Sequence, residues 1–98
     1  MLPVLWLEAA DADLDSIINY IGERDYGAAV RLWQRLRESV LPLSQHPYLY
    51  RQSERVVGLR EIVAHPNYIV LYRVTATHIE VVNVVHARRN FPGPPGEA

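Results

Sequence analysis

The chain of 98 residues contains no cysteine and no lysine. The absence of cysteine excludes disulfide bonds, thiolate nucleophiles and thiolate metal sites, and it is typical of a protein that works in a reducing cytosol. All ten basic residues are arginine, and the guanidinium group favours planar, two-point recognition of carboxylate or phosphate groups. A GC-rich genome, whose codons favour arginine, explains this composition equally well.

No apolar run reaches the length of a signal peptide or a membrane span. The apolar segment Met1–Leu7 lacks a basic lead-in, and Glu8 and Asp11 end its apolar character. We therefore expect a cytoplasmic protein without a targeting segment or membrane contact. Hydrophobic residues make up 49% and charged residues 21% of the chain, which indicates one globular domain with a modest core. We expect this domain at residues 1–91 and a flexible Pro/Gly-rich tail at residues 92–98.

Charge is distributed unevenly along the chain. Residues 1–25 hold six acids against one arginine, a net charge of −5. Residues 26–98 hold nine arginines against five glutamates, a net charge of +4. We expect the basic part of the chain to contact partners and the acidic part to stand apart from them.

Two helices are predicted in the first half of the chain. The first has one apolar face and ends at Gly22, with acids near its positive N-terminus; the apolar positions are Ala10, Leu14, Ile17, Ile18 and Ile21. The second begins near Tyr26 or Gly27 and ends at His46-Pro47, after Pro42 disturbs its last turn. Because the link between the two helices is short, they should pack as an antiparallel hairpin.

Strand patterns flank this hairpin. A short apolar run at Val4–Leu7 comes first, and β-branched runs occur at Val56–Ala64, Tyr68–Val74 and Ile79–His86. The short links between the last three runs predict a three-stranded antiparallel meander. We therefore expect an α+β fold with an N-terminal strand and a two-helix hairpin on one face of an antiparallel sheet. Strict alternation places Ile79, Val81, Asn83 and Val85 on one side of the last strand.

Several segments together resemble the ParE-like toxins of the RelE/ParE superfamily. The segments that carry this resemblance are Gly58–Val63, Tyr68–Val74 and Ile79–Arg89, with Ala10–Ile17 and Leu36–Pro47 upstream. The likeness runs in matching order over roughly residues 4 to 92, which makes it more specific than any single motif.

The resemblance implies a toxin of a type II toxin–antitoxin, or plasmid-stabilisation, module. Such a toxin is neutralised in a hetero-oligomer with a cognate antitoxin whose C-terminal segment wraps it, and the target described for the ParE branch is DNA gyrase. A ribosome-dependent mRNA endonuclease of the RelE type is the alternative, and a non-toxic interaction domain is the second alternative. Against the endonuclease, Ile69 and Phe91 stand where RNase toxins often carry an arginine and a Tyr or His.

Candidate functional residues fall into three groups. His86 is the candidate acid or base, because its ordinary pKa suits proton transfer near neutrality, although a strand-end histidine is more often structural. The target-binding candidates are Arg60, Arg73, Arg88 and Arg89. The residues that we expect to contact the antitoxin are Leu32, Arg31, Arg35, Tyr48 and Tyr50. No metal is expected, because the spacing of His78, Glu80 and His86 does not suit one, and no cofactor is expected.

Overall fold

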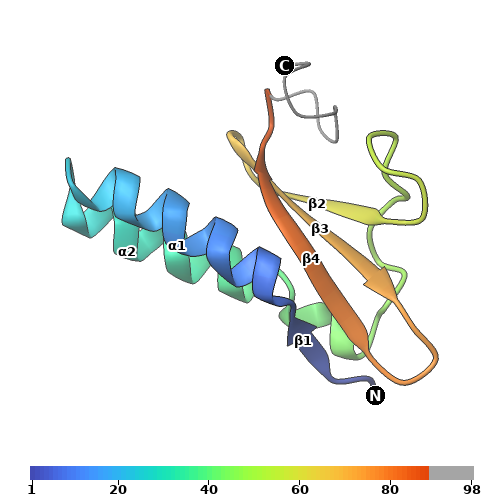
Figure 1. The fold of residues 1–98 in the computed structure, drawn as a ribbon. Helices are drawn as coiled ribbons and strands as arrows, with labels where there is room; N and C mark the ends of the chain where they lie inside the picture. Colours follow the sequence, from blue (N-terminus) through green and yellow to red (C-terminus); the bar gives the residue numbers. More distant parts are fainter. Residues whose placement is uncertain (89–98) are drawn as a thin grey trace.

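Two antiparallel helices lie against one face of a four-stranded sheet in the computed structural model, which describes residues 1–88 (Figure 1). The elements are, in chain order, β1 (Val4–Trp6), α1 (Glu8–Gly22), α2 (Tyr26–Glu38), the 3-10 helix η1 (Leu41–Ser44), β2 (Arg60–His65), β3 (Tyr68–Val74) and β4 (Ile79–His86). The predicted α+β class, with its N-terminal strand, helical hairpin and meander, is confirmed. Arg89 and the predicted tail lie outside the described residues.

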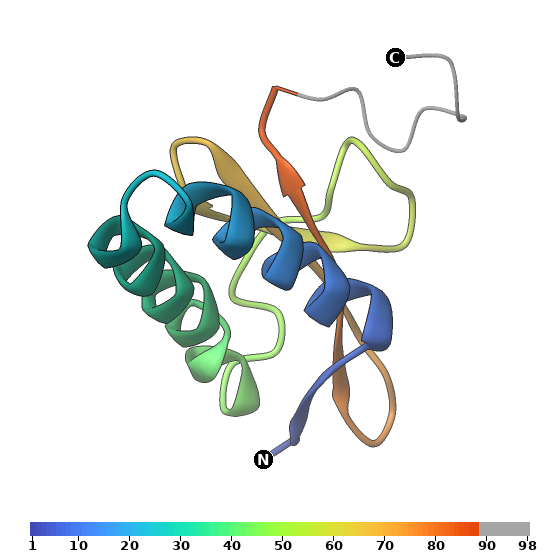
Figure 2. The same ribbon diagram turned by 60° about the vertical axis from the view of Figure 1, so that its left-hand side comes forward.

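The sheet is mixed, which corrects the prediction of a fully antiparallel sheet. Its strand order is β1-β4-β3-β2. The meander β2-β3-β4 is antiparallel as predicted, but β1 pairs with β4 in parallel, with Val4 opposite Ile79. Between these two strands the chain runs through the helical hairpin, η1, β2 and β3, which is more than the long connection that a parallel neighbour needs. Figure 2 shows both helices crossing the sheet side by side.

The ends of the helices depend on local side-chain chemistry. α1 ends at Gly22 as predicted, and Asp25 caps α2 by accepting a 3.0 Å hydrogen bond from the backbone N of Ala28. α2 ends at Glu38, so the predicted end at His46-Pro47 is wrong. Pro42 cannot donate a backbone hydrogen bond, and the chain tightens into η1 around it. Within the described residues, no helix is long and apolar enough to cross a membrane.

Both faces of the sheet carry apolar clusters. The larger cluster lies between the helices and the sheet; its fully buried members include Leu14, Leu36, Val40, Leu43, Val70, Tyr72, Ile79 and Val81. A smaller cluster of Leu59, Ile69, Leu71 and Val85 lies apart from it. Val56 packs against the smaller cluster from the loop before β2. The predicted strand at Val56–Ala64 therefore begins only at Arg60, after Gly58 has taken a positive φ of 88°.

A β-bulge breaks the alternation of β4. The register between β3 and β4 shifts between Leu71 and Tyr72. Val81 packs in the larger cluster, whereas Val85 packs in the smaller one. The prediction that both share one side of β4 is therefore wrong, because one extra residue in a strand reverses the alternation beyond it.

Candidate functional site

The rings of His86 and Tyr68 meet at the C-terminal end of β4, beside the backbone of Arg88. His86 lies opposite Tyr68 in the register of β3 and β4, and the two rings meet edge to face with 5.3 Å between their centroids. The Nδ1 atom of His86 accepts a 3.2 Å hydrogen bond from the backbone N of Arg88. This bond holds the imidazole against the backbone at the end of the strand. A structural role of this kind is the alternative to a role of His86 in acid–base catalysis.

A cleft between α1 and β4 lies beside His86. It has a volume of about 420 Å³ and is lined by Asp13, Ser16, Ile17, Tyr20, Tyr68, Asn83, Val84, Val85 and His86. A single carboxylate oxygen of Asp13 accepts hydrogen bonds from the side chain of Asn83, at 2.9 Å, and from the backbone N of Val84, at 3.0 Å. Asp13 thereby holds α1 against β4. The cleft thus offers hydroxyl groups and one imidazole rather than a free carboxylate.

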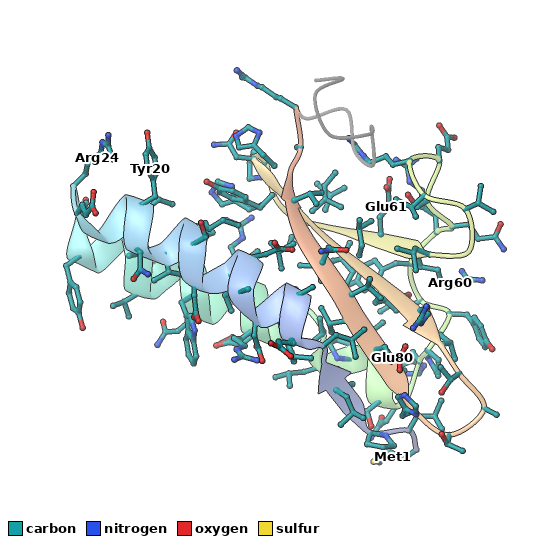
Figure 3. The ribbon with its side chains drawn as sticks, viewed as in Figure 1. Met1, Tyr20, Arg24, Arg60, Glu61 and Glu80 are labelled. Carbon is teal, nitrogen blue, oxygen red and sulfur yellow. The ribbon has the colours of Figure 1, made fainter. Side chains whose placement is uncertain are left out.

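A second hollow lies at the opposite end of the meander and contains Arg60 and Arg73. Its volume is about 520 Å³, and its wall includes Tyr48 and Ser53. Arg60 donates from Nη1 to the backbone O of Tyr50 at 2.8 Å, and its guanidinium carbon lies 4.8 Å from the centre of the Tyr48 ring. Figure 3 shows Arg60 beside the loop that precedes β2, far from Tyr20 near the tip of the hairpin. Both contacts of Arg60 are internal.

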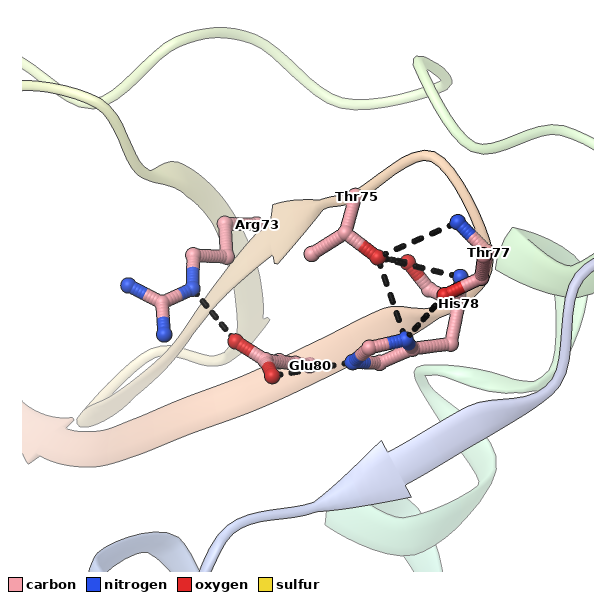
Figure 4. A network of polar contacts seen from close by, with 5 residues as sticks. All are labelled: Arg73, Thr75, Thr77, His78 and Glu80. Atoms are coloured by element: carbon pink, nitrogen blue, oxygen red, sulfur yellow. Dashed lines mark hydrogen bonds and ion pairs between the residues drawn. The ribbon is translucent and has the colours of Figure 1, made fainter.

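Arg73 also has an internal partner, in the polar network of the β3–β4 turn (Figure 4). Its Nε donates to Glu80, and the Nε2 atom of His78 lies 2.9 Å from the other carboxylate oxygen of Glu80. Thr75 and Thr77 contact the Nδ1 atom of His78. The hydrogen bond from His78, and then that from Arg73, lower the pKa of Glu80.

Replacing Glu80 by glutamine is expected to lower the melting temperature near neutral pH but not in acid. Because the folded pKa of Glu80 lies below its ordinary value of 4.5, the ionised carboxylate stabilises the fold fully above the unfolded pKa. That stabilisation is lost as the pH falls through the folded pKa. Melting curves of both proteins should therefore converge below about pH 4.5. A difference that persists undiminished in strong acid would contradict this ionic role.

A buried carboxylate that the sequence patterns did not single out organises the loop before β2. Glu61 is only 4% exposed. It accepts hydrogen bonds from Arg51 at 2.9 Å and Ser53 at 3.0 Å, and the Nε atom of Arg55 lies 3.6 Å away. One carboxylate therefore fixes the loop that supplies one wall of the Arg60 hollow. Glu61 lies in the segment Gly58–Val63, which carries part of the family resemblance, but its partners lie in a loop without a recognisable pattern.

Comparison with known proteins identifies the family. The model of the family described as ParE toxin of type II toxin–antitoxin system, parDE, matches residues 4–91. The chain belongs to the ParE toxin family. It is 35% identical over 89 residues to "Toxin RelE2" of Caulobacter vibrioides, covering 91% of this chain and 99% of that one. It is 33% identical over 90 residues to "Putative toxin Y4kP" of Sinorhizobium fredii, covering 91% and 92%.

A solved structure gives the same assignment. The fold is similar to that in "Chromosomal ParDE TA system from P. aeruginosa", with a TM-score of 0.78 and 27% identity. The similarity covers 88% of this chain and 96% of that chain. The chain is thus a type II toxin of the RelE/ParE superfamily.

The residues predicted to contact an antitoxin are divided between core and surface. Leu32 is 7% exposed and belongs to the core, which leaves it no surface for a partner. Tyr50 is half-buried and packs edge to face on Tyr72. Arg35 donates a 2.7 Å hydrogen bond to the backbone O of Ala64 and so ties α2 to β2. The antitoxin contact that we predicted for Leu32 stays a prediction.

The remaining members of that group are more accessible. Tyr48 is 65% exposed, and Arg31 lies exposed on α2. Among residues 1–88, the guanidinium groups of Arg31 and Arg88 make no hydrogen bond or ion pair. Within the described residues, the positive charges of these two arginines are therefore not used in stabilising the fold.

The arginines that we predicted to bind the target form two groups rather than one patch. Arg60 and Arg73 share the hollow near the start of β4, whereas Arg88 comes after the end of that strand. The run of β4 from Glu80 to His86 separates the groups by roughly 20 Å at the usual rise per residue. Arg89 lies outside the described residues. No cluster of three or more potential metal ligands occurs within residues 1–88.

Proposed function

We propose that this toxin arrests growth by binding DNA gyrase in the cytoplasm, and that a cognate antitoxin neutralises it in a hetero-oligomer. Membership of the ParE family supports the toxin and antitoxin parts of this proposal. We further propose that Arg88 and Arg89 contact the target directly, because the Arg88 side chain is exposed and is not held by a partner within the described residues. Arg60 and Arg73 would form a secondary contact.

The observation that favours a binding inhibitor over a nuclease is the distance between His86 and the sheet arginines. RNA cleavage needs a base, an acid and cations gathered around one phosphate. His86 lies at one end of β4, whereas Arg60 and Arg73 lie near the other end. The internal contacts of Arg60 and Arg73 also hold both guanidinium groups in place. A single phosphate cannot contact the histidine and either of these arginines together.

A second candidate function is ribosome-dependent mRNA cleavage. The cleft beside His86 favours it, because Tyr68, Tyr20 and Ser16 offer hydroxyl groups near the imidazole. Arg88 is close in the chain and would supply positive charge. The cleft is therefore the place where this alternative must be tested.

We also propose that the antitoxin contacts Tyr48, Arg31 and the exposed part of Arg35. A small toxin that must be silenced needs an interface of standard size or more. Exposed tyrosine and arginine side chains are frequent anchors of such interfaces. Tyr50 and Leu32 would support this surface from the core without contacting the partner.

Inducing the chain in cells tests the proposal. Growth should stop, plasmid DNA should lose negative supercoiling, and mRNA should remain intact. Co-expression of a cognate antitoxin should restore growth and yield a stable complex. Unimpaired growth, together with purification of the chain in quantity from cells without any antitoxin, would overturn the proposal.

The variant His86→Gln separates a binder from a nuclease. Glutamine keeps the size and hydrogen bonding of histidine but does not titrate near neutral pH, so a nuclease that uses His86 should lose roughly a hundredfold or more of its activity. We expect growth arrest to remain close to wild type. Codon-specific cuts in mRNA within minutes of induction, absent in His86→Gln, would instead establish the nuclease.

A further inference from the structure

An exposed apolar stripe runs along α2 on the side that continues toward β1. Tyr26, Val30 and Trp33 are 78%, 38% and 42% exposed, and Arg37 comes next on the same side of the helix. Their spacing of four, three and four residues is that of one helix face. Such a row lies outside the core cluster, whose α2 members are Leu32 and Leu36 with Val40 beyond them. Single exposed apolar residues are ordinary, but a contiguous row indicates a contact surface.

Two hollows flank Trp33 on this side of the molecule. The first, about 580 Å³, is lined by Ile18, Asn19, Gly22, Glu23, Tyr26, Ala29, Val30 and Trp33. The second, about 380 Å³, is lined by Val4, Trp6, Trp33, Arg37, Glu38, Val40 and Leu41. The small size of Gly22 and Ala29 leaves the first hollow room for a large ring. Trp33 thus lines both hollows of its own chain. Its exposed ring also projects far enough to enter a hollow of a second molecule.

The stripe is self-complementary. An antiparallel copy of α2, related by a twofold axis midway between Val30 and Trp33, would place Val30 against Trp33 of the partner. The same axis would place Tyr26 against Arg37 of the partner. A twofold interface requires this kind of pairing: if one residue contacts a second residue of the partner, the second residue also contacts the first residue of the partner.

Charge along the stripe suits the same arrangement. The segment that leads into α2 is acidic on balance, with Glu23 on the wall of the first hollow and Asp25 at the cap against Arg24 between them. The C-terminal end is basic on balance, with Arg35 and Arg37 against Glu38. The Arg37 guanidinium lies 3.4 Å from Asp11 and stacks over the rings of Trp6 and Trp33, at 4.4 Å and 5.5 Å from their centres, while its Nε atom is buried without a hydrogen-bond partner. An antiparallel copy brings the acidic end of one helix beside the basic end of the other. A parallel copy would bring like charges together.

We propose that two copies of this chain associate through α2, packed antiparallel, with Trp33 of each copy in the hollow beside Val30 of the other. This interface is separate from the proposed target contacts at Arg88 and Arg89, and it does not depend on the proposed function. Arg37 of one copy meets Tyr26 and Glu23 of the other.

Single-cysteine cross-linking tests the interface, because the chain has no cysteine of its own. At an interaxial distance of about 8–10 Å, the two copies of residue 30 have Cα atoms roughly 6–7 Å apart, near disulfide range. The full-length variant Val30→Cys should therefore form a covalent dimer under mild oxidation. In Tyr26→Cys the two cysteines lie roughly 16 Å apart along the helix, so little cross-linking is expected; Arg31→Cys, on another side of α2, is the matched control.

Sedimentation of the full chain without added oxidant provides the second measurement. The wild type should sediment as a dimer at about 100 μM and dissociate on dilution toward 1 μM, while Val30→Arg, which brings two like charges to the axis, should bind itself at least tenfold more weakly. Equal cross-linking at residues 26, 30 and 31 would overturn the proposal. A wild type that stays monomeric at every concentration would also overturn the proposal. If, in that case, Val30→Arg no longer bound an antitoxin that restores growth, the stripe would be assigned to the antitoxin.

Discussion

Changing Arg88 and Arg89 together to alanine is expected to abolish growth arrest and to leave the fold intact. Truncating one arginine anchor in an interface costs about 2 kcal/mol or more, so losing two should weaken target binding by roughly a thousandfold. The Arg88 side chain supports no other described residue, so the free energy of unfolding should change by no more than about 0.5 kcal/mol. Growth after graded induction and chemical denaturation measure the two effects.

Two further variants make this result specific. Arg31→Ala removes another exposed guanidinium without a described partner and should keep full toxicity, which excludes a general effect of net charge. Arg60→Ala with Arg73→Ala should also lower stability, because these side chains hold the Tyr50 carbonyl and Glu80. A folded Arg88/Arg89 double variant that still stops growth would exclude this end of β4 as the target contact.

The helices and the meander could be predicted because their signals are local. The apolar spacing around Leu14, the stop at Gly22 and the short links of the meander all act within a few residues. The parallel pairing of β1 could not be predicted, because the three residues Val4–Trp6 contain no sequence pattern that indicates which strand they pair with. Only the packing of the hairpin brings them beside β4.

The candidate site was predicted in part, for the same reason. The types and positions of Arg60 and Arg73 were visible in the sequence, but their partners Tyr50 and Glu80 were not. The sequence presented both arginines as free charges for a partner. Their internal contacts show that both side chains also stabilise the fold. The bulge in β4 was equally hidden, since an extra residue in a strand leaves an apolar run unchanged.

The contacts that fix the site join distant segments. Asp13 binds the backbone N of Val84 from α1, and Glu61 binds Arg51 and Ser53 from the loop before β2. Neither acid is distinguished in sequence from the other acids of the chain. A buried carboxylate is recognised only when the structure shows that its hydrogen-bond donors surround it.

Replacing Tyr72 by alanine is expected to remove most of the stability of this small domain. Tyr72 is 0% exposed in the larger cluster, and deleting a buried aromatic ring of this size costs about 3–5 kcal/mol. A small domain has little more than that to lose. Chemical denaturation should show a much lower midpoint, or a chain already unfolded in buffer.

The variants Tyr72→Phe and Tyr20→Ala separate the contributions to this loss. The Tyr72 hydroxyl donates a 3.0 Å hydrogen bond to the backbone O of Pro47, and burial raises the pKa of Tyr72, so the hydroxyl stays protonated and keeps this bond at neutral pH. Tyr72→Phe keeps the ring and should lose about 1 kcal/mol, while exposed Tyr20→Ala should lose within about 0.5 kcal/mol. Equal losses in Tyr72→Phe and Tyr72→Ala would mean that the bond to Pro47, rather than the packed ring, stabilises this part of the core. In that case the loop that carries Tyr48 would depend on one hydrogen bond for its position.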